Sequence, residues 1–126
     1  MTKFKFDENG LMPAIVQDYK NGDVLMLAYV NRTAIRKMLA IGKTCFYSRS
    51  RKKYWVKGKE SGHIQQIKKI STDCDRDTLL IHVKQTGGAC HLGYRSCFVH
   101  FLDHNGNSKR VAAKRLFDPK KVYRTS

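Results

Sequence analysis

Several features that mark exported or membrane-bound proteins are absent from this sequence. The segment from Met1 to Asp7 contains no apolar run of signal-peptide length, and no later stretch approaches the length of a membrane span. Internal repeats and low-complexity linkers are also absent. We therefore expect a cytoplasmic protein with no membrane partner.

Acidic residues are scarce. The chain has 10 Asp and Glu against 25 Lys and Arg, which gives a formal net charge of +15. A surplus of this size attracts nucleic acids, acidic membranes or phosphorylated small molecules, and it does not choose among them. The basic residues are spread along the whole chain, which favours a generally charged surface over one binding arm.

The length of 126 residues predicts a single domain that spans residues 1–126. Apolar runs at 15–19 and 24–29 flank an Asn-Gly turn at 20–23, a strong signal for a β-hairpin. Further strands are predicted at 44–49, 54–57, 64–70, 78–84 and 97–102. The pattern favours a compact α+β domain, mainly antiparallel sheet, with one or two short helices.

One helix is predicted directly after the first hairpin. Asn31 can act as its N-cap and Gly42 as its C-terminal stop. Ile35, Met38 and Leu39 fall on one helical face, at positions i, i+3 and i+4. Near the C-terminus, a turn at 104–107 should lead into a strand at 111–117, and Asp118-Pro119 favours a last helical turn.

The chain has four cysteines but no Cys-x-x-Cys pair, so rules for zinc ribbons and fingers give limited support. In a reducing cytosol these cysteines should be free thiols or metal ligands. Cys45 is predicted to be a core residue. Cys74, Cys90 and Cys97 match the three protein ligands of a catalytic zinc, which keeps its fourth position for water. The alternative is that they are small core residues.

Three carboxylates, those of Asp73, Asp75 and Asp77, lie within five residues of one another in the chain. They are too crowded to stay ionised without a cation, and oxygen ligands suit Mg²⁺. The alternative is a solvated turn. In an extended segment the carboxylates would point to one face and Cys74 to the other, so we expect separate carboxylate and thiolate sites.

These motifs together resemble the phosphoribosyl-AMP cyclohydrolase family of histidine biosynthesis. The resemblance rests on Asp-Cys-Asp-x-Asp-x-Leu-Leu at 73–80, Val-x-Gln at 83–85 and Ala-Cys-His-x-Gly-x-x-Ser-Cys-Phe at 89–98. Upstream, the matches in the same order are the segment at 46–51, Trp55, Lys57-Gly58 and Glu60-Ser61-Gly62-His63. The resemblance covers about residues 13–98, and its specificity lies in the combination of motifs.

The resemblance implies a hydrolase that opens the N1–C6 bond of the adenine ring in N1-(5-phosphoribosyl)-AMP. It implies one Zn²⁺ per subunit on Cys74, Cys90 and Cys97, and Mg²⁺ on the three aspartates. It also implies an intertwined homodimer in which one zinc cysteine comes from the opposite subunit. The product would be the formimino imidazole carboxamide ribotide.

His91, next to Cys90, is the expected general base; the alternatives are a further zinc ligand or a positioning group. Serine hydroxyls and arginine guanidinium groups suit phosphate, and an aromatic ring can stack on the purine or fill the core. The expected substrate-binding residues are Ser48, Arg49, Ser50, Arg51, Trp55, Ser61 and His63. For the Ser61–His63 segment the alternative is a surface turn.

A rival from another class is a zinc-stabilised basic module that binds nucleic acid. Aromatic residues set among basic ones, such as Phe46, Tyr47 and Trp55, favour it, but it leaves the aspartates unexplained. A nucleobase deaminase also uses zinc, but its His-x-Glu and Pro-Cys-x-x-Cys signature is missing. We therefore expect a phosphorylated nucleotide as substrate and no specific nucleic-acid partner.

Overall fold

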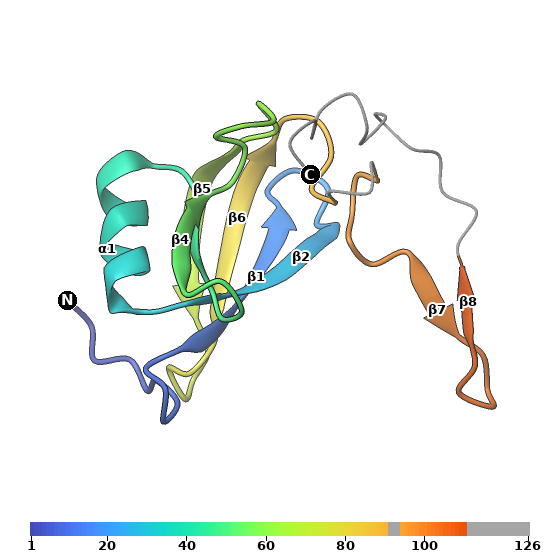
Figure 1. Cartoon of the computed structure of the whole chain (residues 1–126), viewed down its shortest axis with the longest axis horizontal. Helices are drawn as coiled ribbons and strands as arrows, with labels where there is room; N and C mark the ends of the chain where they lie inside the picture. The colour runs from blue at the N-terminus through green and yellow to red at the C-terminus, as the bar shows by residue number, and fades with distance from the viewer. Residues whose placement is uncertain (91–93, 111–126) are drawn as a thin grey trace.

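A computed structural model describes residues 1–90 and 94–110, and a four-stranded sheet forms the centre of the fold (Figure 1). Its strand order is β2-β1-β6-β5. The strands are β1 (Met12–Asp18), β2 (Val24–Val30), β5 (Gln65–Thr72) and β6 (Leu79–Gln85). The pairs β1–β2 and β5–β6 are antiparallel, and β1–β6 is parallel. The predicted α+β class is confirmed.

The β1–β2 hairpin forms at the predicted Asn-Gly turn. Asp18 organises the turn, because its Oδ1 accepts hydrogen bonds from the backbone N–H groups of Lys20 and Asn21. Gly22 then adopts a φ of 80°, a conformation that glycine reaches without steric cost. The hairpin prediction is therefore confirmed.

Helix α1 (Arg32–Ile41) follows, with the predicted caps at both ends. Asn31 accepts a hydrogen bond from the N–H of Ala34, and Gly42 is left-handed with its N–H bonded to the carbonyl of Met38. The helix buries Ala34, Ile35 and Met38, whereas Leu39 is 62% exposed. Although Leu39 lies on the same side of the helix as Ile35 and Met38, it falls beyond the edge of the stripe centred on the buried three, because each residue turns about 100°.

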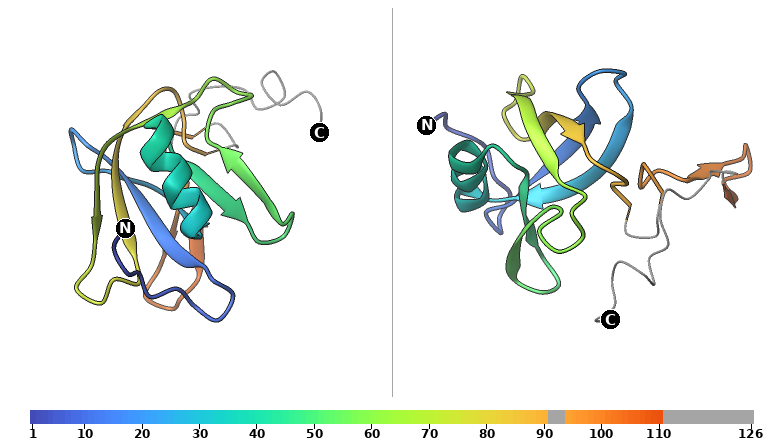
Figure 2. Two further views of the ribbon diagram at one scale, coloured as in Figure 1. Left: turned by 90° about the vertical axis from the view of Figure 1, so that its left-hand side faces the viewer. Right: turned by 90° about the horizontal axis from the view of Figure 1, so that it is seen from above.

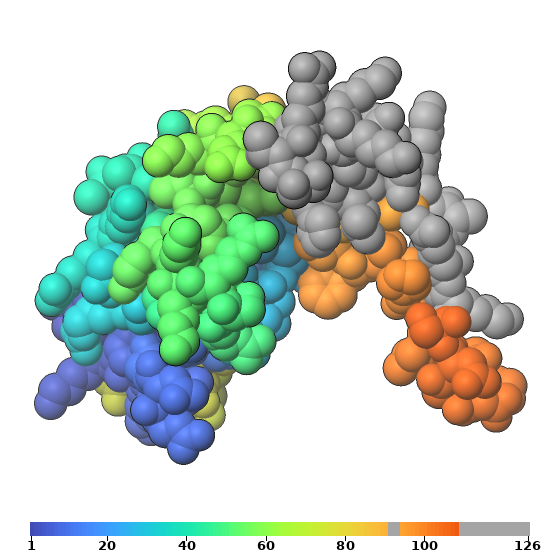
Figure 3. Space-filling model, viewed as in Figure 1, coloured from blue at the N-terminus to red at the C-terminus, as the bar shows by residue number. Residues whose placement is uncertain are grey.

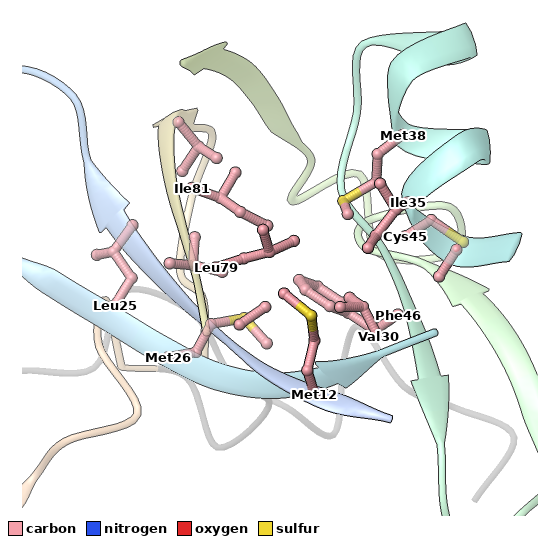
Figure 4. Packing of buried hydrophobic residues seen from close by; sticks show 14 of the residues in the cluster. Met12, Leu25, Met26, Val30, Ile35, Met38, Cys45, Phe46, Leu79 and Ile81 are labelled. Atoms are coloured by element: carbon pink, nitrogen blue, oxygen red, sulfur yellow. The ribbon is translucent and has the colours of Figure 1, made fainter. Parts of the chain in front are cut away.

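A second hairpin, β3 (Cys45–Ser48) and β4 (Lys53–Val56), packs with α1 on one face of the sheet (Figure 2). Figure 4 shows Phe46 of this hairpin and Met38 of the helix close to Met12 and Leu79 of the sheet. Cys45 is fully buried in the same cluster, as predicted. The core therefore fixes the position of β3, whose far end carries part of the candidate site.

The opposite face of the sheet carries a strip of apolar side chains. Residues of β1 and β6 alternate between buried and half-buried, so one face is fully covered and the other is not. Ile15 lies opposite Leu27 on β2 and Leu80 on β6, and Leu27 is 44% exposed. The outer face thus offers a second apolar surface.

After β6 the chain leaves the sheet and forms a small hairpin, β7 (His100–Leu102) and β8 (Ser108–Arg110). The hairpin projects from the body of the molecule (Figure 3), with Phe101 and Leu102 exposed. The turn predicted at 104–107 is present, but the predicted strand at 97–102 starts only at His100. The strand predicted at 111–117 and the helical turn at 118–119 lie outside the described residues.

In the part of the chain that the structure describes, no helix has the length and apolar character needed to cross a membrane.

Candidate active site

The carboxylates of Asp73, Asp75 and Asp77 gather at the turn between β5 and β6. Their ligand oxygens all lie within 4.8 Å of one another, and all three residues are exposed. The segment is a tight turn, because Arg76 has a φ of 59° and the N–H of Asp77 bonds to Oδ1 of Asp73 at 3.1 Å. The expected extended geometry was therefore wrong; a bend in the backbone gathers the carboxylates.

Crowding perturbs two of these carboxyl groups in opposite directions. The pKa of Asp77 is raised, first by its side-chain hydrogen bond with Asp73 and then by desolvation and the charges of Asp73 and Asp75. For Asp73, desolvation acts to raise the pKa, but hydrogen bonds from Asp77 and from neighbouring backbone N–H groups lower it overall. A divalent cation would relieve this repulsion, and the oxygen donors fit Mg²⁺.

Cys90 and Cys97 stand on the loop that follows β6. The N–H of Cys90 bonds to the carbonyl of Tyr94 at 3.0 Å, which folds the loop back on itself. The N–H of Cys97 bonds to the carbonyl of Leu25 at 2.7 Å, which attaches the loop to β2. Both cysteines are therefore held by the main chain at the same end of the sheet.

The two thiols lie next to each other. The pKa of Cys97 is raised to about 11, mainly by burial of its thiol and next by the charge of Cys90, which also shares a hydrogen bond with it. Cys97 as a residue is exposed, but its sulfur is enclosed enough for this effect. Adjacent thiols of this kind become thiolates when a soft metal ion binds them.

Lys57 lies beside this thiol pair, directly after β4. The residue is 7% exposed, and its N–H bonds to the carbonyl of Thr44. Burial lowers the pKa of Lys57, and the neighbouring charges of Cys97 and Cys90 partly offset that effect. Lys57 belongs to the segment that resembles the family, but the sequence alone assigned it no role. Its position allows an ammonium group to balance thiolate charge at the site.

Cys74 lies at the opposite end of the sheet from the other two expected zinc ligands. It is exposed in the β5–β6 turn, whereas Cys90 follows the far end of β6. Strand β6 spans roughly 20 Å at about 3.3 Å per residue, so the two ends are well separated (Figure 1). Among the described residues, only the three aspartates form a group of three or more possible metal ligands.

An open cleft of about 550 Å³ contains four of the expected substrate-binding residues. It is lined by Ala28, Tyr29, Tyr47, Ser48, Arg49, Ser50 and Trp55. The guanidinium carbon of Arg49 lies 3.8 Å from the ring centroid of Tyr29. Trp55 packs against the core residue Phe46, with ring centroids 4.9 Å apart, yet stays 37% exposed. Trp55 therefore serves the core and also faces the cleft.

Tyr29 was not among the expected site residues. Its place near the end of β2 and the cluster of basic residues at 49–53 were both visible in the sequence, but their pairing depends on the contact between β2 and β3. The stack of Arg49 on Tyr29 orients the guanidinium group at the cleft, as cation–π contacts do.

The remaining expected substrate residues lie elsewhere. Arg51 is exposed in the β3–β4 turn and does not line the cleft; its N–H bonds to Oγ of Ser48. Ser61 and His63 share a turn in which Ser61 Oγ accepts the N–H of His63. The side chain of Gln85 donates to the carbonyl of His63 and so connects this turn to the end of β6. His91 lies outside the described residues.

Comparisons with known proteins match the whole region that carries these groups. The family model described as phosphoribosyl-AMP cyclohydrolase matches residues 26–99. A phosphoribosyl-AMP cyclohydrolase of Pelotomaculum thermopropionicum is 53% identical over 98% of this chain and 95% of that protein. One from Methanoregula boonei is 50% identical over 98% of this chain and 96% of that protein.

A histidine biosynthesis bifunctional protein of Thermoanaerobacter pseudethanolicus is 49% identical over 98% of this chain, which corresponds to 56% of the longer protein. The match to the family model and the near-complete coverage of the single-activity relatives agree with each other. The chain therefore belongs to the phosphoribosyl-AMP cyclohydrolase family, the hydrolases that act in histidine biosynthesis.

Proposed function

We propose that this chain opens the N1–C6 bond of the adenine ring in N1-(5-phosphoribosyl)-AMP at a zinc site made by Cys74, Cys90 and Cys97. The main support from the structure is the adjacency of the Cys90 and Cys97 thiols, with the buried Lys57 beside them. Soft sulfur donors of this kind select zinc over magnesium. Three such ligands leave one position for a water molecule.

The third ligand is proposed to come from a second copy of the chain, because Cys74 lies beyond the other end of β6. We therefore propose a homodimer that holds one zinc ion per subunit. The apolar strip on the outer face of the sheet and the exposed Phe101 and Leu102 of the β7–β8 hairpin support such an association. Exposed apolar side chains of this kind are a usual property of protein interfaces.

The chemistry begins with the substrate, whose adenine carries a phosphoribosyl group on N1 and therefore a positive charge that makes C6 electrophilic. Zinc, when bound, lowers the pKa of water from about 15.7 to about 7 and so provides a nucleophile at neutral pH. His91 is proposed to take a proton from the water that adds to C6, after which the N1–C6 bond breaks. General bases contribute about 10²- to 10⁴-fold to such steps.

Substrate binding is assigned to the cleft beside β3. Ser48, Arg49 and Ser50 offer hydroxyl and guanidinium donors for phosphate, and the exposed edge of Trp55 can stack on the purine. Mg²⁺ on Asp73, Asp75 and Asp77 is proposed to contact a substrate phosphate. Arg51, Ser61 and His63 are proposed to contact the substrate from neighbouring loops.

The test is the change in ultraviolet absorbance when purified protein is incubated with phosphoribosyl-AMP. We expect ring opening that a zinc chelator abolishes and added zinc restores. Cys90→Ser should lose both activity and zinc, while Cys45→Ala, which removes a thiol from the core, should keep both.

Turnover that survives zinc removal would contradict the zinc site and leave the reaction standing. No turnover by protein loaded with zinc and supplied with Mg²⁺ would contradict the reaction itself. In that case salt-dependent titration with single-stranded and duplex DNA would test the nucleic-acid-binding alternative.

A further inference from the structure

Arg95 connects the loop of Cys90 and Cys97 to the turn between β1 and β2. Its Nη2 lies 2.5 Å from Oδ2 of Asp18, and its Nη1 lies 2.9 Å from Oδ2 of Asp23. One guanidinium group thus bridges two carboxylates that belong to the same turn. We call these three side chains the Arg95 clamp.

Asp18 is prepared for this contact by its own turn. The residue is 9% exposed, and its other oxygen, Oδ1, already accepts two backbone N–H groups, from Lys20 at 2.8 Å and from Asn21 at 3.0 Å. The carboxylate therefore cannot rotate freely, and Oδ2 is fixed toward Arg95. Burial acts to raise the pKa of Asp18, but these hydrogen bonds and Arg95 lower it overall, so the group is ionised at neutral pH.

Arg95 is also tied to the cysteine loop through its main chain. Its carbonyl accepts the N–H of Ala89 at 2.9 Å, one step from the bond between Cys90 and Tyr94. The guanidinium group of Arg95 thus contacts the β1–β2 turn, while its carbonyl contacts the chain just before Cys90. Movement of Arg95 would shift the irregular segment that presents Cys90.

The residues after Arg95 continue the attachment to β2. Ser96 Oγ donates to the carbonyl of Val24 at 2.8 Å, and the N–H of Cys97 donates to the carbonyl of Leu25. Segment 95–97 therefore lies along the start of β2, anchored at its first residue by the Arg95 clamp.

We propose that Arg95 is a positioning residue that acts with Asp18 and Asp23 to hold the Cys90 and Cys97 thiols together for the metal. The inference rests on the proposed zinc site. It assigns Arg95 no contact with substrate or with reacting atoms. Residues that orient metal ligands from outside commonly change metal affinity or activity by about 10- to 100-fold when they are removed.

The clamp is suited to this role because one charged guanidinium group pairs with two carboxylates. A guanidinium group that meets two carboxylates in fixed directions resists rotation of the loop, whereas a lysine can satisfy only one such direction well. A clamp that served only overall stability would change unfolding without a specific effect on zinc. The two roles therefore differ in what they predict for metal release.

The experiment measures the rate at which zinc-loaded, full-length protein releases zinc to a chromogenic chelator in excess. Arg95→Ala should accelerate release by about tenfold or more, and Arg95→Lys should fall between Arg95→Ala and wild type. Asp18→Asn should also accelerate release, and the Arg95→Ala/Asp18→Asn double variant should release zinc no faster than the more affected single variant. Arg36→Ala, which removes an exposed charge from α1, should leave the rate unchanged.

Thermal unfolding of the same zinc-loaded proteins separates positioning from folding. If Arg95→Ala does not fold, Asp23→Asn removes only the more exposed half of the clamp and carries the same prediction with a smaller effect. A wild-type release rate in folded Arg95→Ala would overturn the clamp, and so would additive effects in the double variant. Cys90→Ser that keeps its zinc would instead overturn the zinc site itself.

Discussion

The imidazole ring of His63 packs directly against the backbone of Gly87. A Cβ placed on Gly87 would lie 2.9 Å from both Cγ and Cδ2 of that ring, closer than real Cβ contacts come. Gly87 also has a φ of 69°, in the left-handed region that favours glycine. The contact brings the Ser61–His63 turn against the chain that leads to Cys90. The packing at Gly87 therefore connects two proposed parts of the site.

Gly87→Ala should therefore be destabilising for two reasons. The left-handed backbone costs a non-glycine residue about 1–2 kcal/mol, and the clash with His63 adds to that cost. Gly62→Ala is the matched control, because Gly62 has a φ of 78° but nothing within 4 Å of its added Cβ. Urea unfolding should show a larger loss for Gly87→Ala than for Gly62→Ala. Equal losses would mean that the ring moves aside without cost.

Gln65 should be among the polar residues whose loss most weakens the fold. Its side chain is fully buried, accepts from Thr44 Oγ1 at 2.8 Å and donates to Gln85 Oε1 at 2.8 Å. Gln65→Leu strands both partners, and each unsatisfied group costs about 1–3 kcal/mol. Gln66→Leu, at an exposed position on the same strand, should change the free energy of unfolding little. Chemical denaturation of both variants checks the difference.

The double variant Thr44→Val/Gln65→Leu gives a sharper result. Because it removes both partners of one hydrogen bond, its loss of stability should be smaller than the sum of the two single losses. Additive losses would indicate that the two side chains act independently.

Features that depend on a few neighbouring residues were predictable from the sequence. The Asn-Gly turn, the Asn31 cap and the Gly42 stop act within one turn of chain, and all three were confirmed. The parallel pairing of β1 with β6 was not predictable, because it joins segments more than sixty residues apart, as Ala14 opposite Leu79 illustrates. Local patterns contain no information about that choice.

In the candidate site, too, the features set by nearby residues were predictable and those set by long-range packing were not. The spacing of Asp73, Asp75 and Asp77 was enough to predict that their carboxylates meet, although the backbone reason was wrong. Lys57 beside Cys97 and Arg49 on Tyr29 depend on how the β3–β4 hairpin packs, so the residue pattern alone could not assign them. The distance between Cys74 and Cys90 likewise follows from the length and direction of β6.

Asp75→Asn should weaken binding of Mg²⁺ or Mn²⁺ and leave zinc content unchanged. The turn would lose one of three clustered carboxylates, and hard divalent cations depend on the number of charged oxygen ligands. We expect affinity to fall on the order of tenfold or more, the scale on which even outer-shell changes act. Titration calorimetry with Mn²⁺ and metal analysis would check both parts. Glu8→Gln, which removes an exposed charge elsewhere, is the control.

Asp18 should contribute to the loss of folding stability at acid pH. Its folded-state pKa lies below its ordinary value of 3.8, because hydrogen bonds and Arg95 outweigh desolvation. The stabilisation is therefore fully present above about that value and is lost as pH falls through the folded-state pKa. Asp18→Asn should cost about 2 kcal/mol at neutral pH, since hydrogen bonds to charged groups contribute about 1.5–3 kcal/mol.

The difference in unfolding free energy between wild type and Asp18→Asn should then shrink as pH falls below 3.8. Denaturant unfolding at a series of pH values measures it. Asp23→Asn should show a smaller difference, because its side chain is 59% exposed. If the difference in unfolding free energy between wild type and Asp18→Asn stayed constant down to the acid transition, it would contradict a lowered pKa of Asp18.

Cys74→Ser and Cys90→Ser should complement each other if the zinc site is shared between two chains. Each variant alone lacks a ligand at every site and should be inactive. In a mixed dimer, Cys74 of one chain and the Cys90–Cys97 pair of the other are both intact, so one of its two sites is restored. Random mixing makes half of the dimers mixed, and equal amounts should recover about a quarter of wild-type activity and zinc.

Cys90→Ser mixed with Cys97→Ser is the control, because Cys90 and Cys97 belong to the same loop and lie next to each other in one chain. In that mixture every site still lacks one of the pair, so no activity should return. Complementation by Cys74→Ser but not by Cys97→Ser would locate the subunit boundary between the β5–β6 turn and the loop after β6. Full activity of Cys74→Ser alone would show instead that the metal needs only the ligands of one chain. The separation of Cys74 from Cys90 along β6 would then be no reason to propose that a second chain supplies a ligand.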